Sequence, residues 1–334
     1  MIVAGRWADL LKDGKALMSE AFAEGTWVNL RTQWKKFDKF CEYFELSIKF
    51  PFTAELLVAY ITWLCTQLRA QNSVQNYVSG MKTFHVLKGF ATDGFDDISV
   101  KLALKGAARR LHHTKKQAQP MTPTILYQLR QLLDLRTPMD ATYWALFILS
   151  FVMFMRKSNM VPDSVKSFNP SKQLIRADFR LKNGNLMVHG KWSKVNQFGS
   201  RTGGIPVLAM DSVLCPVMAF KDMCTLVPGE GKDPAFCVMT GGVLRPITYR
   251  MFQQKLKSLV EAAGYNPADF STHSFRRGGA SLAYKAGISG ETIKVLGDWK
   301  SNAYMEYLEC PLVVKTKAAV QFTKVVVSEL NQRL

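Results

Sequence analysis

Apolar residues in the first third of the chain recur at intervals of three and four, which is the period of one face of an amphipathic α-helix. The pattern predicts helices over residues 27–44, 53–68, 73–88 and 100–111. Thr53 precedes the second of these and Gly89 follows the third, and both residue types favour helix ends. We interpret the apolar stripes as the faces that pack into a core.

The segment 112–123 interrupts this pattern. It is polar and basic and contains two prolines, in the order HHTKKQAQPMTP, which is a composition typical of a linker. We therefore expect two domains, residues 1–111 and 124–334. The last part of the second domain, residues 311–334, is expected to form an apolar tail.

Beyond the linker, helical and strand patterns alternate. Helices are expected over residues 124–133 and 140–156, from residue 213 onward, and over 248–263, 272–287, 291–296 and 303–308. Asn183-Gly184 separates the apolar segments 174–180 and 185–189, and Asn-Gly is a strong signal for a β-hairpin. Residues 204–208 read as a further strand. The second domain is thus predicted to be mostly helical, with a small sheet near its start.

Several classes of protein do not fit the sequence. The longest apolar run, residues 143–155, predicts a buried helix, because a membrane span needs about 20 apolar residues. Residues 1–13 lack the pattern of a secretory signal. The six cysteines form no CxxC pair and are expected to be free thiols in a reducing compartment. There is no HExxH motif or Cys/His cluster, so a structural zinc site is not expected.

The charge of the chain indicates a polyanionic partner. Among 334 residues, 44 are Lys or Arg and 26 are Asp or Glu, a formal net charge of +18, while 48% are apolar, as in a globular protein. Nucleic acid, an anionic membrane or an acidic protein would each suit this charge. Residues 1–117 carry a net +6 and the remainder +12. Because both parts are basic, a two-part clamp around a duplex fits better than a single charged tail.

The segment Thr272–Ala280, THSFRRGGA, carries the first specific chemistry. On a helix, His273 and Arg276 share a face because they are three residues apart. Arg offers a planar fork of donors to a phosphate, and His accepts a proton near neutral pH. For an isolated HxxR, the solvated basic first turn of a helix is the favoured interpretation.

This segment belongs to an ordered series of motifs. Arg156 ends an apolar helix, a hairpin presents Lys191-Trp192-Ser193-Lys194, the His-x-x-Arg motif follows, and a turn at Gly297 precedes Tyr307 by ten residues. The series resembles the catalytic domain of tyrosine recombinases, the phage-integrase family. The sequence Gly-Asp-Trp-Lys-Ser before Tyr-x-x-Tyr is most similar to that of eukaryotic mobile-element recombinases of the Crypton or DIRS-like types.

The resemblance covers nearly the whole chain and implies a fold. The fold class would be mainly α with a small β-sheet. A helical core-binding domain with a SAM-like fold would occupy residues 1–111, and an α+β tyrosine-recombinase catalytic domain would occupy residues 124–334.

The resemblance also implies roles for individual residues. Arg156 and Arg276 would clamp the scissile phosphate, because its transition state gains negative charge. Tyr307 would be the nucleophile that keeps the bond energy in a 3′-phosphotyrosine intermediate. His273 would accept the tyrosine proton or hold a phosphate oxygen, and Lys194 would protonate the departing 5′ oxygen. No metal or other cofactor is implied.

Three assignments have rivals. Lys191 competes with Lys194 for the hairpin position, and Tyr304 lies one turn before Tyr307. The residue after the turn glycine usually donates a hydrogen bond to the phosphate. That residue is Asp298 here, and the indole N–H of Trp299 is our candidate for the role, since a carboxylate facing the phosphate would weaken the site by like charge.

The resulting hypothesis is a site-specific DNA recombinase or integrase of a mobile element, acting on double-stranded DNA. The family pattern implies a tetramer on two DNA sites with the tail docking in trans, no membrane, and a nuclear location if the host is eukaryotic, otherwise cytoplasm or nucleoid. The alternatives are a catalytically weakened or inactive DNA-binding protein derived from such an enzyme, and a type IB topoisomerase-like enzyme.

Overall fold

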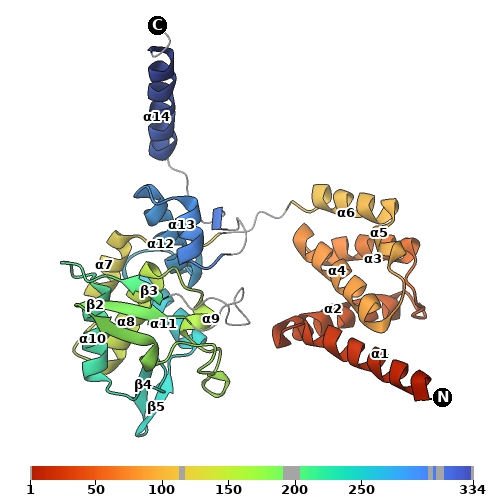
Figure 1. Ribbon diagram of the computed structural model, residues 1–334, viewed down its shortest axis with the longest axis horizontal. Helices are drawn as coiled ribbons and strands as arrows, with labels where there is room; N and C mark the ends of the chain where they lie inside the picture. The colour runs from red at the N-terminus through yellow and green to blue at the C-terminus, as the bar shows by residue number, and fades with distance from the viewer. Residues whose placement is uncertain (1, 113–116, 191–203, 300–303, 306–311, 332–334) are drawn as a thin grey trace. The chain divides into compact units, whose positions relative to one another are not determined.

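The computed structural model describes residues 2–112, 117–190, 204–299, 304–305 and 312–331. The chain divides into two compact units, residues 1–116 and 117–334 (Figure 1). Each unit has its own hydrophobic core. The predicted fold class, mainly α with a small β-sheet, is confirmed.

The first unit is helical, as its apolar spacing predicted. Its helices are α1 (Ile2–Glu20), α2 (Glu24–Tyr43), α3 (Ala54–Gln67), α4 (Gln71–Lys88), α5 (Asp93–Asp96) and α6 (Ile98–Arg110). Helix α3 packs against α6, and α2 packs against α4. The hydroxyl of Thr53 accepts a hydrogen bond from the N–H of Leu56 at 3.2 Å, so Thr53 caps the first turn of α3.

Aromatic rings make up much of the core of this unit. The ring of Phe37 lies 4.6 Å from that of Phe52 and 5.0 Å from that of Tyr60, and all three are buried. His85 is fully buried among these rings. Its Nε2 accepts a hydrogen bond from the N–H of Phe52 at 3.0 Å, and its Nδ1 lies 2.9 Å from the carbonyl oxygen of Met81. A neutral imidazole with its proton on Nδ1 satisfies both contacts.

The second unit surrounds one apolar helix. Its helices are α7 (Pro123–Gln131), α8 (Pro138–Val152), α9 (Lys157–Met160), α10 (Pro216–Leu226), α11 (Tyr249–Ala262), α12 (His273–Lys285), α13 (Gly290–Leu296) and α14 (Leu312–Asn331). Residues 141–151 of α8 are all buried, and α10 and α12 pack against this helix. Their burial explains the longest apolar run of the sequence. Within the described residues, no helix has the length and hydrophobicity that crossing a membrane requires.

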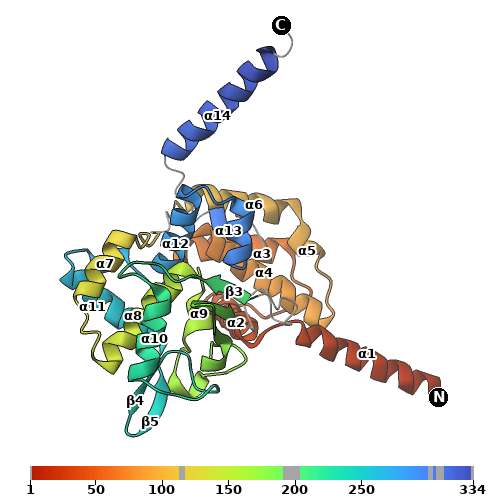
Figure 2. The same ribbon diagram turned by 60° about the vertical axis from the view of Figure 1, so that its left-hand side comes forward.

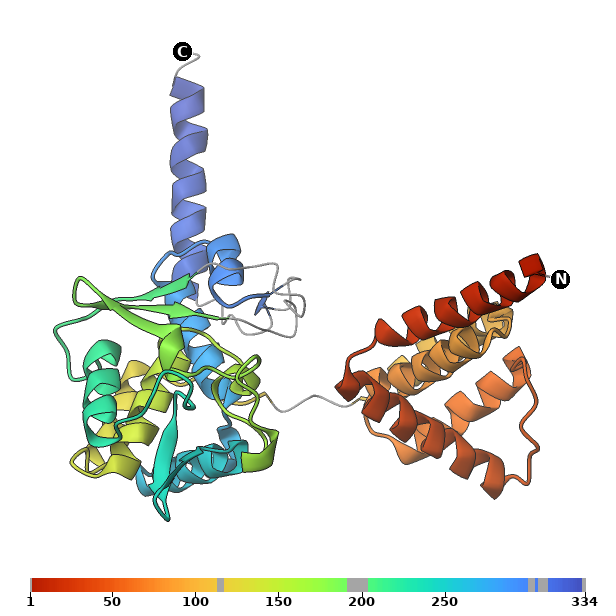
Figure 3. The same ribbon diagram turned by 60° about the horizontal axis from the view of Figure 1, so that its bottom comes forward.

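Two small antiparallel sheets complete this unit. The strands are β1 (Phe179–Lys182), β2 (Asn185–His189), β3 (Gly204–Val207), β4 (Cys237–Thr240) and β5 (Val243–Pro246). The first sheet has the order β1-β2-β3 and lies on one side of the helices, as Figure 3 shows. Its predicted hairpin turn is present, since Asn183 and Gly184 both have positive φ, +50° and +78°. Strands β4 and β5 form a second hairpin.

The structure differs from the predicted elements at several places. Helix α1, the short helices α5 and α9, and the hairpin of β4 and β5 were not predicted. Most of the helix expected over residues 303–308 lies outside the described residues. The first hairpin strand, expected over residues 174–180, begins only at Phe179, because residues 176–178 form a single 3₁₀ turn. Helix α8, expected to reach Arg156, ends at Val152, and the chain bends there before α9.

Candidate active site

The bend after α8 sets the position of Arg156. Phe154 has a φ of +51°, a left-handed conformation that a residue with a bulky side chain rarely adopts. Arg156 follows in extended conformation and precedes the first turn of α9. After this bend, the carbonyl of Phe154 accepts a hydrogen bond from Arg276 and the side chain of Arg156 contacts Asp298.

Gly279 on α12 allows this bend to pack closely. A Cβ atom on Gly279 would lie 2.2 Å from the carbonyl oxygen of Phe151 and 2.5 Å from the ring of Phe154. Both distances are shorter than a real Cβ contact, so only glycine fits. The close approach brings α12, which carries the His-x-x-Arg motif, against the end of α8.

The neighbouring residues of α12 hold the segment that enters the second unit. A Cβ atom on Gly278 would lie 1.8 Å from the carbonyl oxygen of Met121. The guanidinium of Arg277 donates hydrogen bonds to Oε1 of Gln117 at 2.6 Å and to the carbonyl oxygen of Ala118 at 3.1 Å. The end of the predicted linker is thus fastened to the helix that carries Arg276.

Arg276 is almost completely buried, with 2% of its surface exposed. Its guanidinium donates hydrogen bonds to the carbonyl oxygen of Phe154 and, at 2.7 Å, to that of Gly297. The same guanidinium lies over the ring of Trp299, 3.6 Å from the ring centroid. A buried cation needs such partners, and both carbonyls and the aromatic face supply negative potential. These contacts hold the guanidinium in one orientation.

Arg156 reaches the same turn from the other side. Its Nη2 donates a hydrogen bond to the carbonyl oxygen of Asp298 at 3.1 Å, and its Nη1 lies 3.4 Å from Oδ2 of that residue. The side chains of Arg156 and Asp298 are 19% and 28% exposed, so the pair is at the edge of the solvent. Asp298 has a φ of +53°, a conformation that Asp and Asn tolerate better than most residues.

Residues 297–299 therefore connect both predicted clamp arginines. Arg276 binds the carbonyl of Gly297 and Arg156 binds that of Asp298, the next residue. The turn follows α13, which packs beside α12 (Figures 1 and 2). Two guanidinium groups held at adjacent carbonyls of one turn can bind a single tetrahedral anion with paired donors.

An apolar cluster supports this turn. It consists of Phe154, Ala280, Ala283, Ile293, Trp299 and Tyr304. Trp299 is buried, and a Cβ atom on Gly297 would lie 1.6 Å from its ring. Tyr304 is also buried, with its ring centroid 6.1 Å from that of Trp299. Both Trp299 and Tyr304 thus pack inside this cluster.

The other residues predicted for the site are His273, Lys194 with its rival Lys191, and Tyr307. His273 is exposed at the start of α12, one turn before Arg276, and its N–H donates to Oγ of Ser271 at 3.2 Å. Lys194, its rival Lys191 and the predicted nucleophile Tyr307 lie outside the described residues. The structure brings Arg156, Arg276 and Trp299 together, and the roles assigned to all six residues stay predictions.

Sequence reasoning missed three features of the site. The carbonyl of Phe154 and the pairing of Asp298 with Arg156 depend on backbone bends that no motif signals. The role of Arg277 in holding the entering segment was also missed, although Gly278 and Gly279 beside it indicated close backbone packing. Among the described residues, no group of His, Cys, Asp and Glu side chains could hold a metal ion.

Comparisons with known proteins concern the chain as a whole. No protein-family model matches the chain. The "Integrase/recombinase xerD homolog" of Selenomonas ruminantium is 26% identical over 324 residues, which cover 91% of this chain and 87% of that protein. The likeness to eukaryotic mobile-element recombinases is not tested by this relative and stays a prediction.

Solved structures show the same fold. The Tn1549 transposon integrase in complex with transposon right end DNA superposes with a TM-score of 0.63 at 11% identity, covering 92% of this chain and 99% of that one. A lambda integrase dimer bound to a COC' core site gives a TM-score of 0.56 at 15% identity, covering 90% and 94%. XerH site-specific recombinase bound to a palindromic difH substrate gives 0.55 at 13% identity, covering 86% and 76%. These structures show that the chain has the fold of known integrases and site-specific recombinases, and most of its length also aligns with an integrase/recombinase in sequence.

Proposed function

We propose that this chain is a site-specific DNA recombinase that cuts and rejoins duplex DNA through a covalent 3′-phosphotyrosine. One observation carries the proposal: Arg156 and Arg276, 120 positions apart in a chain of 334 residues, converge on the turn at residues 297–298. Two oriented cations at one point suit the extra negative charge of a phosphodiester transition state. The resemblance of the motif series to tyrosine recombinases implies a clamp made of the same two residues.

The chemistry follows from the roles that the family pattern assigns. The phenol oxygen of Tyr307 would attack the scissile phosphorus while the bond from phosphorus to the 5′ oxygen breaks. His273 would take the phenol proton, and Lys194 would give a proton to the departing 5′ oxygen. In the second step, the 5′ hydroxyl of another strand would attack the phosphotyrosine and restore the phenol. The bond energy is conserved, so strand exchange is balanced without a further reactant.

DNA and oligomer contacts belong to the same proposal. The net charge of +18 supports binding to the DNA backbone, with an affinity that falls steeply as salt rises. We further infer that four protomers act on two duplexes and that residues 311–334 dock on a neighbouring protomer. A lambda integrase tetramer bound to a Holliday junction has a TM-score of 0.51 to this chain at 12% identity. A protein with a similar fold therefore forms a tetramer on DNA, which supports the inference of four protomers.

Trapping the covalent intermediate tests the proposal. The protein would be incubated with nicked duplexes that cover the DNA flanking its coding sequence, because a nick lets the short product diffuse away after cleavage. We expect an SDS-resistant protein–DNA adduct that the Tyr307→Phe variant does not form and the Tyr304→Phe variant does.

Other outcomes would change the function. DNA binding without any adduct would indicate the DNA-binding protein that sequence analysis left as an alternative. An adduct that persists in Tyr307→Phe and disappears in Tyr304→Phe would move the nucleophile. Relaxation of supercoiled plasmid that contains no recombination site would indicate a topoisomerase.

A further inference from the structure

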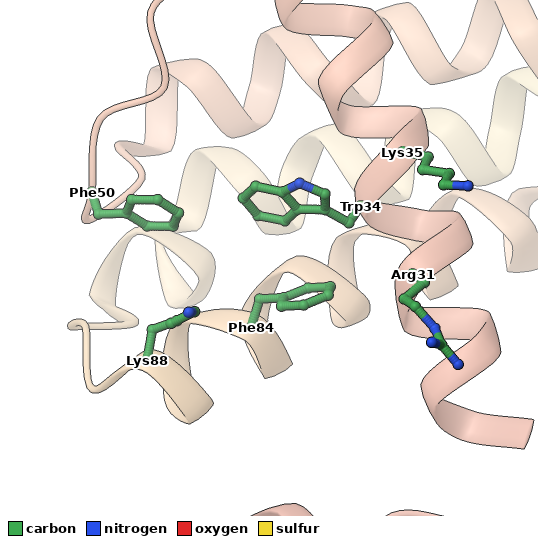
Figure 4. Close-up of a pocket in the computed structure, with 6 residues that line it drawn as sticks. All are labelled: Arg31, Trp34, Lys35, Phe50, Phe84 and Lys88. Carbon is green, nitrogen blue, oxygen red and sulfur yellow. The ribbon is translucent and has the colours of Figure 1, made fainter. Parts of the chain in front are cut away.

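A pocket of about 420 Å³ lies in the first unit and is lined by residues of α2, of α4 and of the segment between α2 and α3, whereas every residue that the proposed chemistry uses belongs to the second unit. Its lining consists of Arg31, Trp34, Lys35, Phe50, Phe84 and Lys88 (Figure 4). The size is within the range of small-molecule and cofactor sites. Its composition is specific as well, because three aromatic rings are combined with three cations.

The rings form an apolar wall that the core does not cover. Trp34 and Phe84 meet edge to face with centroids 5.0 Å apart, and Phe50 is nearly parallel to Trp34 at 6.1 Å. All three side chains are partly exposed. The buried ring of Phe52 stacks beneath Phe50 at 5.0 Å, so the wall rests on the rigid aromatic core of this unit.

The cations stand on both sides of this wall. Arg31 and Lys35 flank Trp34 on α2, and Lys88 is one turn beyond Phe84 at the end of α4. Figure 4 shows Lys88 on the other side of the rings from Arg31 and Lys35. No acidic residue lines the pocket. Within the part of the chain that the structure describes, none of these three cations forms an ion pair.

We propose that this pocket binds one unpaired nucleotide of a DNA single strand. The base would lie against the aromatic wall, and the phosphates on its 5′ and 3′ sides would lie toward Lys88 on one side and Arg31 and Lys35 on the other. Aromatic stacking is open to every base, and cations beside the rings hold the backbone. An acidic peptide with an aromatic residue matches less well, because it carries no obligatory charge on each side of its ring.

This inference rests on the proposed function, since strand exchange must take bases out of one duplex before they pair in another. A protein that holds an unpaired nucleotide would lower the free energy of that intermediate. The pocket would then add a single-strand site to the duplex contacts expected of both units.

Photo-cross-linking of the full-length protein tests the proposal directly. The probe is a single-stranded 12-mer with one 5-iodouracil, which cross-links to an aromatic ring in contact with it, and the cross-linked residue is identified by mass spectrometry. We expect the cross-link at Trp34, Phe50 or Phe84. Cross-links only at other residues would overturn the proposal.

Matched variants separate binding by the cations of the pocket from the attraction of DNA to the net positive charge of the protein. A competitor oligonucleotide without bases tests the contribution of stacking. In Arg31→Gln/Lys88→Gln we expect the cross-link yield to fall about tenfold, the effect of losing about 1.4 kcal/mol of binding. Lys12→Gln/Lys39→Gln, which removes the same charge from exposed positions outside the pocket, should lose much less. Equal losses in the two doubles would overturn the proposal, as would equal competition by a 12-mer whose sugars carry no bases.

Two further outcomes keep this proposal distinct from the enzymatic one. Competition by a Glu-Tyr-Phe-Glu peptide that exceeds competition by the oligonucleotide would make the pocket a peptide site and overturn the nucleotide assignment. Cross-linking needs no strand cleavage, so it would survive a failure to form the Tyr307 adduct. Conversely, the adduct assay would survive a failure of the cross-link.

Discussion

Arg156 and Asp298 are joined twice although they are 142 positions apart: the guanidinium binds both the carbonyl oxygen and the carboxylate of Asp298. The carbonyl contact orients the arginine, whereas the carboxylate occupies part of the donor fork that a phosphate would use. In this arrangement a DNA phosphate must displace the carboxylate before Arg156 can clamp it. Asp298 thus both positions the arginine and competes with its ligand.

Replacing Asp298 by Asn should increase adduct formation. Asn keeps the size of the side chain and tolerates the left-handed backbone, so the carbonyl contact to Arg156 is retained while the competing charge is removed. The pair is partly exposed, and such pairs contribute about 0.2–1 kcal/mol, so we expect an increase of about 1.4-fold to fivefold in the single-turnover cleavage rate.

The control for this change is Asp163→Asn, because Asp163 forms an exposed ion pair with Lys157 close to the site. It removes the same charge and should leave the rate nearly unchanged. A cleavage rate in Asp298→Asn that is below that of the unmodified protein would show that the carboxylate supports the chemistry.

Trp299 should affect catalysis through Arg276. The ring lies 3.6 Å from the guanidinium, and a desolvated cation–π contact is worth about 2 kcal/mol. Trp299→Leu should therefore lower the cleavage rate about thirtyfold with little loss of DNA affinity, and Trp299→Phe, which keeps an aromatic face, should lose less. The rate would be measured under single-turnover conditions and the affinity by fluorescence anisotropy. Equal losses in both variants would instead indicate that the indole N–H donates to the phosphate.

Gly278 should be intolerant of even one added methyl group. A Cβ atom there meets the backbone of Met121, which cannot rotate away, and overpacking of this kind costs about 1–3 kcal/mol. Gly278→Ala should lower the free energy of unfolding by that amount in urea denaturation. Gly106→Ala, at an open position within α6, should raise it by about 0.5–1 kcal/mol, because Ala favours the helix. A stabilised Gly278→Ala would show that the entering segment is not held as tightly as the structure indicates.

The features predictable from the sequence are those set by local spacing. Apolar periodicity located the helices of the first unit, and Asn183-Gly184 located a hairpin, because both signals act over a few residues. Gly241-Gly242 carried a similar signal, with both φ values positive, but it was overlooked. Helix α1 was missed although Trp7, Leu10 and Leu11 follow helical spacing, and all three are exposed. Apolar residues at helical spacing are weak evidence for a helix when they do not pack into a core, as in α1.

The site was predictable in its residue types but not in its contacts. The order of Arg156, Arg276 and the Gly297 turn indicated a phosphate clamp. The bends at Phe154 and Asp298 were not predictable, because a non-glycine residue adopts a positive φ only where tertiary packing demands it. The contact between Asp298 and Arg156 depends on those bends, so it could be identified only from the structure.

His85 should make the stability of the first unit depend on pH. Burial lowers the pKa of this imidazole below its ordinary value of 6.5, although the hydrogen bond to the carbonyl of Met81 acts in the opposite direction. Protonation would also place an N–H on Nε2, which now accepts from the N–H of Phe52. The neutral form is therefore the one that fits the core.

The sign of the effect follows from proton binding. Above pH 6.5 the imidazole is neutral in both the folded and the unfolded state, so it adds no pH dependence. Below pH 6.5 the unfolded state binds a proton that the folded state resists. Stability should then fall by up to about 1.36 kcal/mol per pH unit until the lowered pKa of the folded state is reached.

Urea denaturation of the His85→Gln variant tests this expectation between pH 5 and pH 8. Gln has no titratable group, so the variant should lose this part of the pH dependence even if it is less stable at every pH. His112→Gln, at an exposed position of the same unit, should keep the slope of the unmodified protein. If His85→Gln retained the full slope below pH 6.5, another group would be responsible for the acid sensitivity, and the buried imidazole would have no part in it.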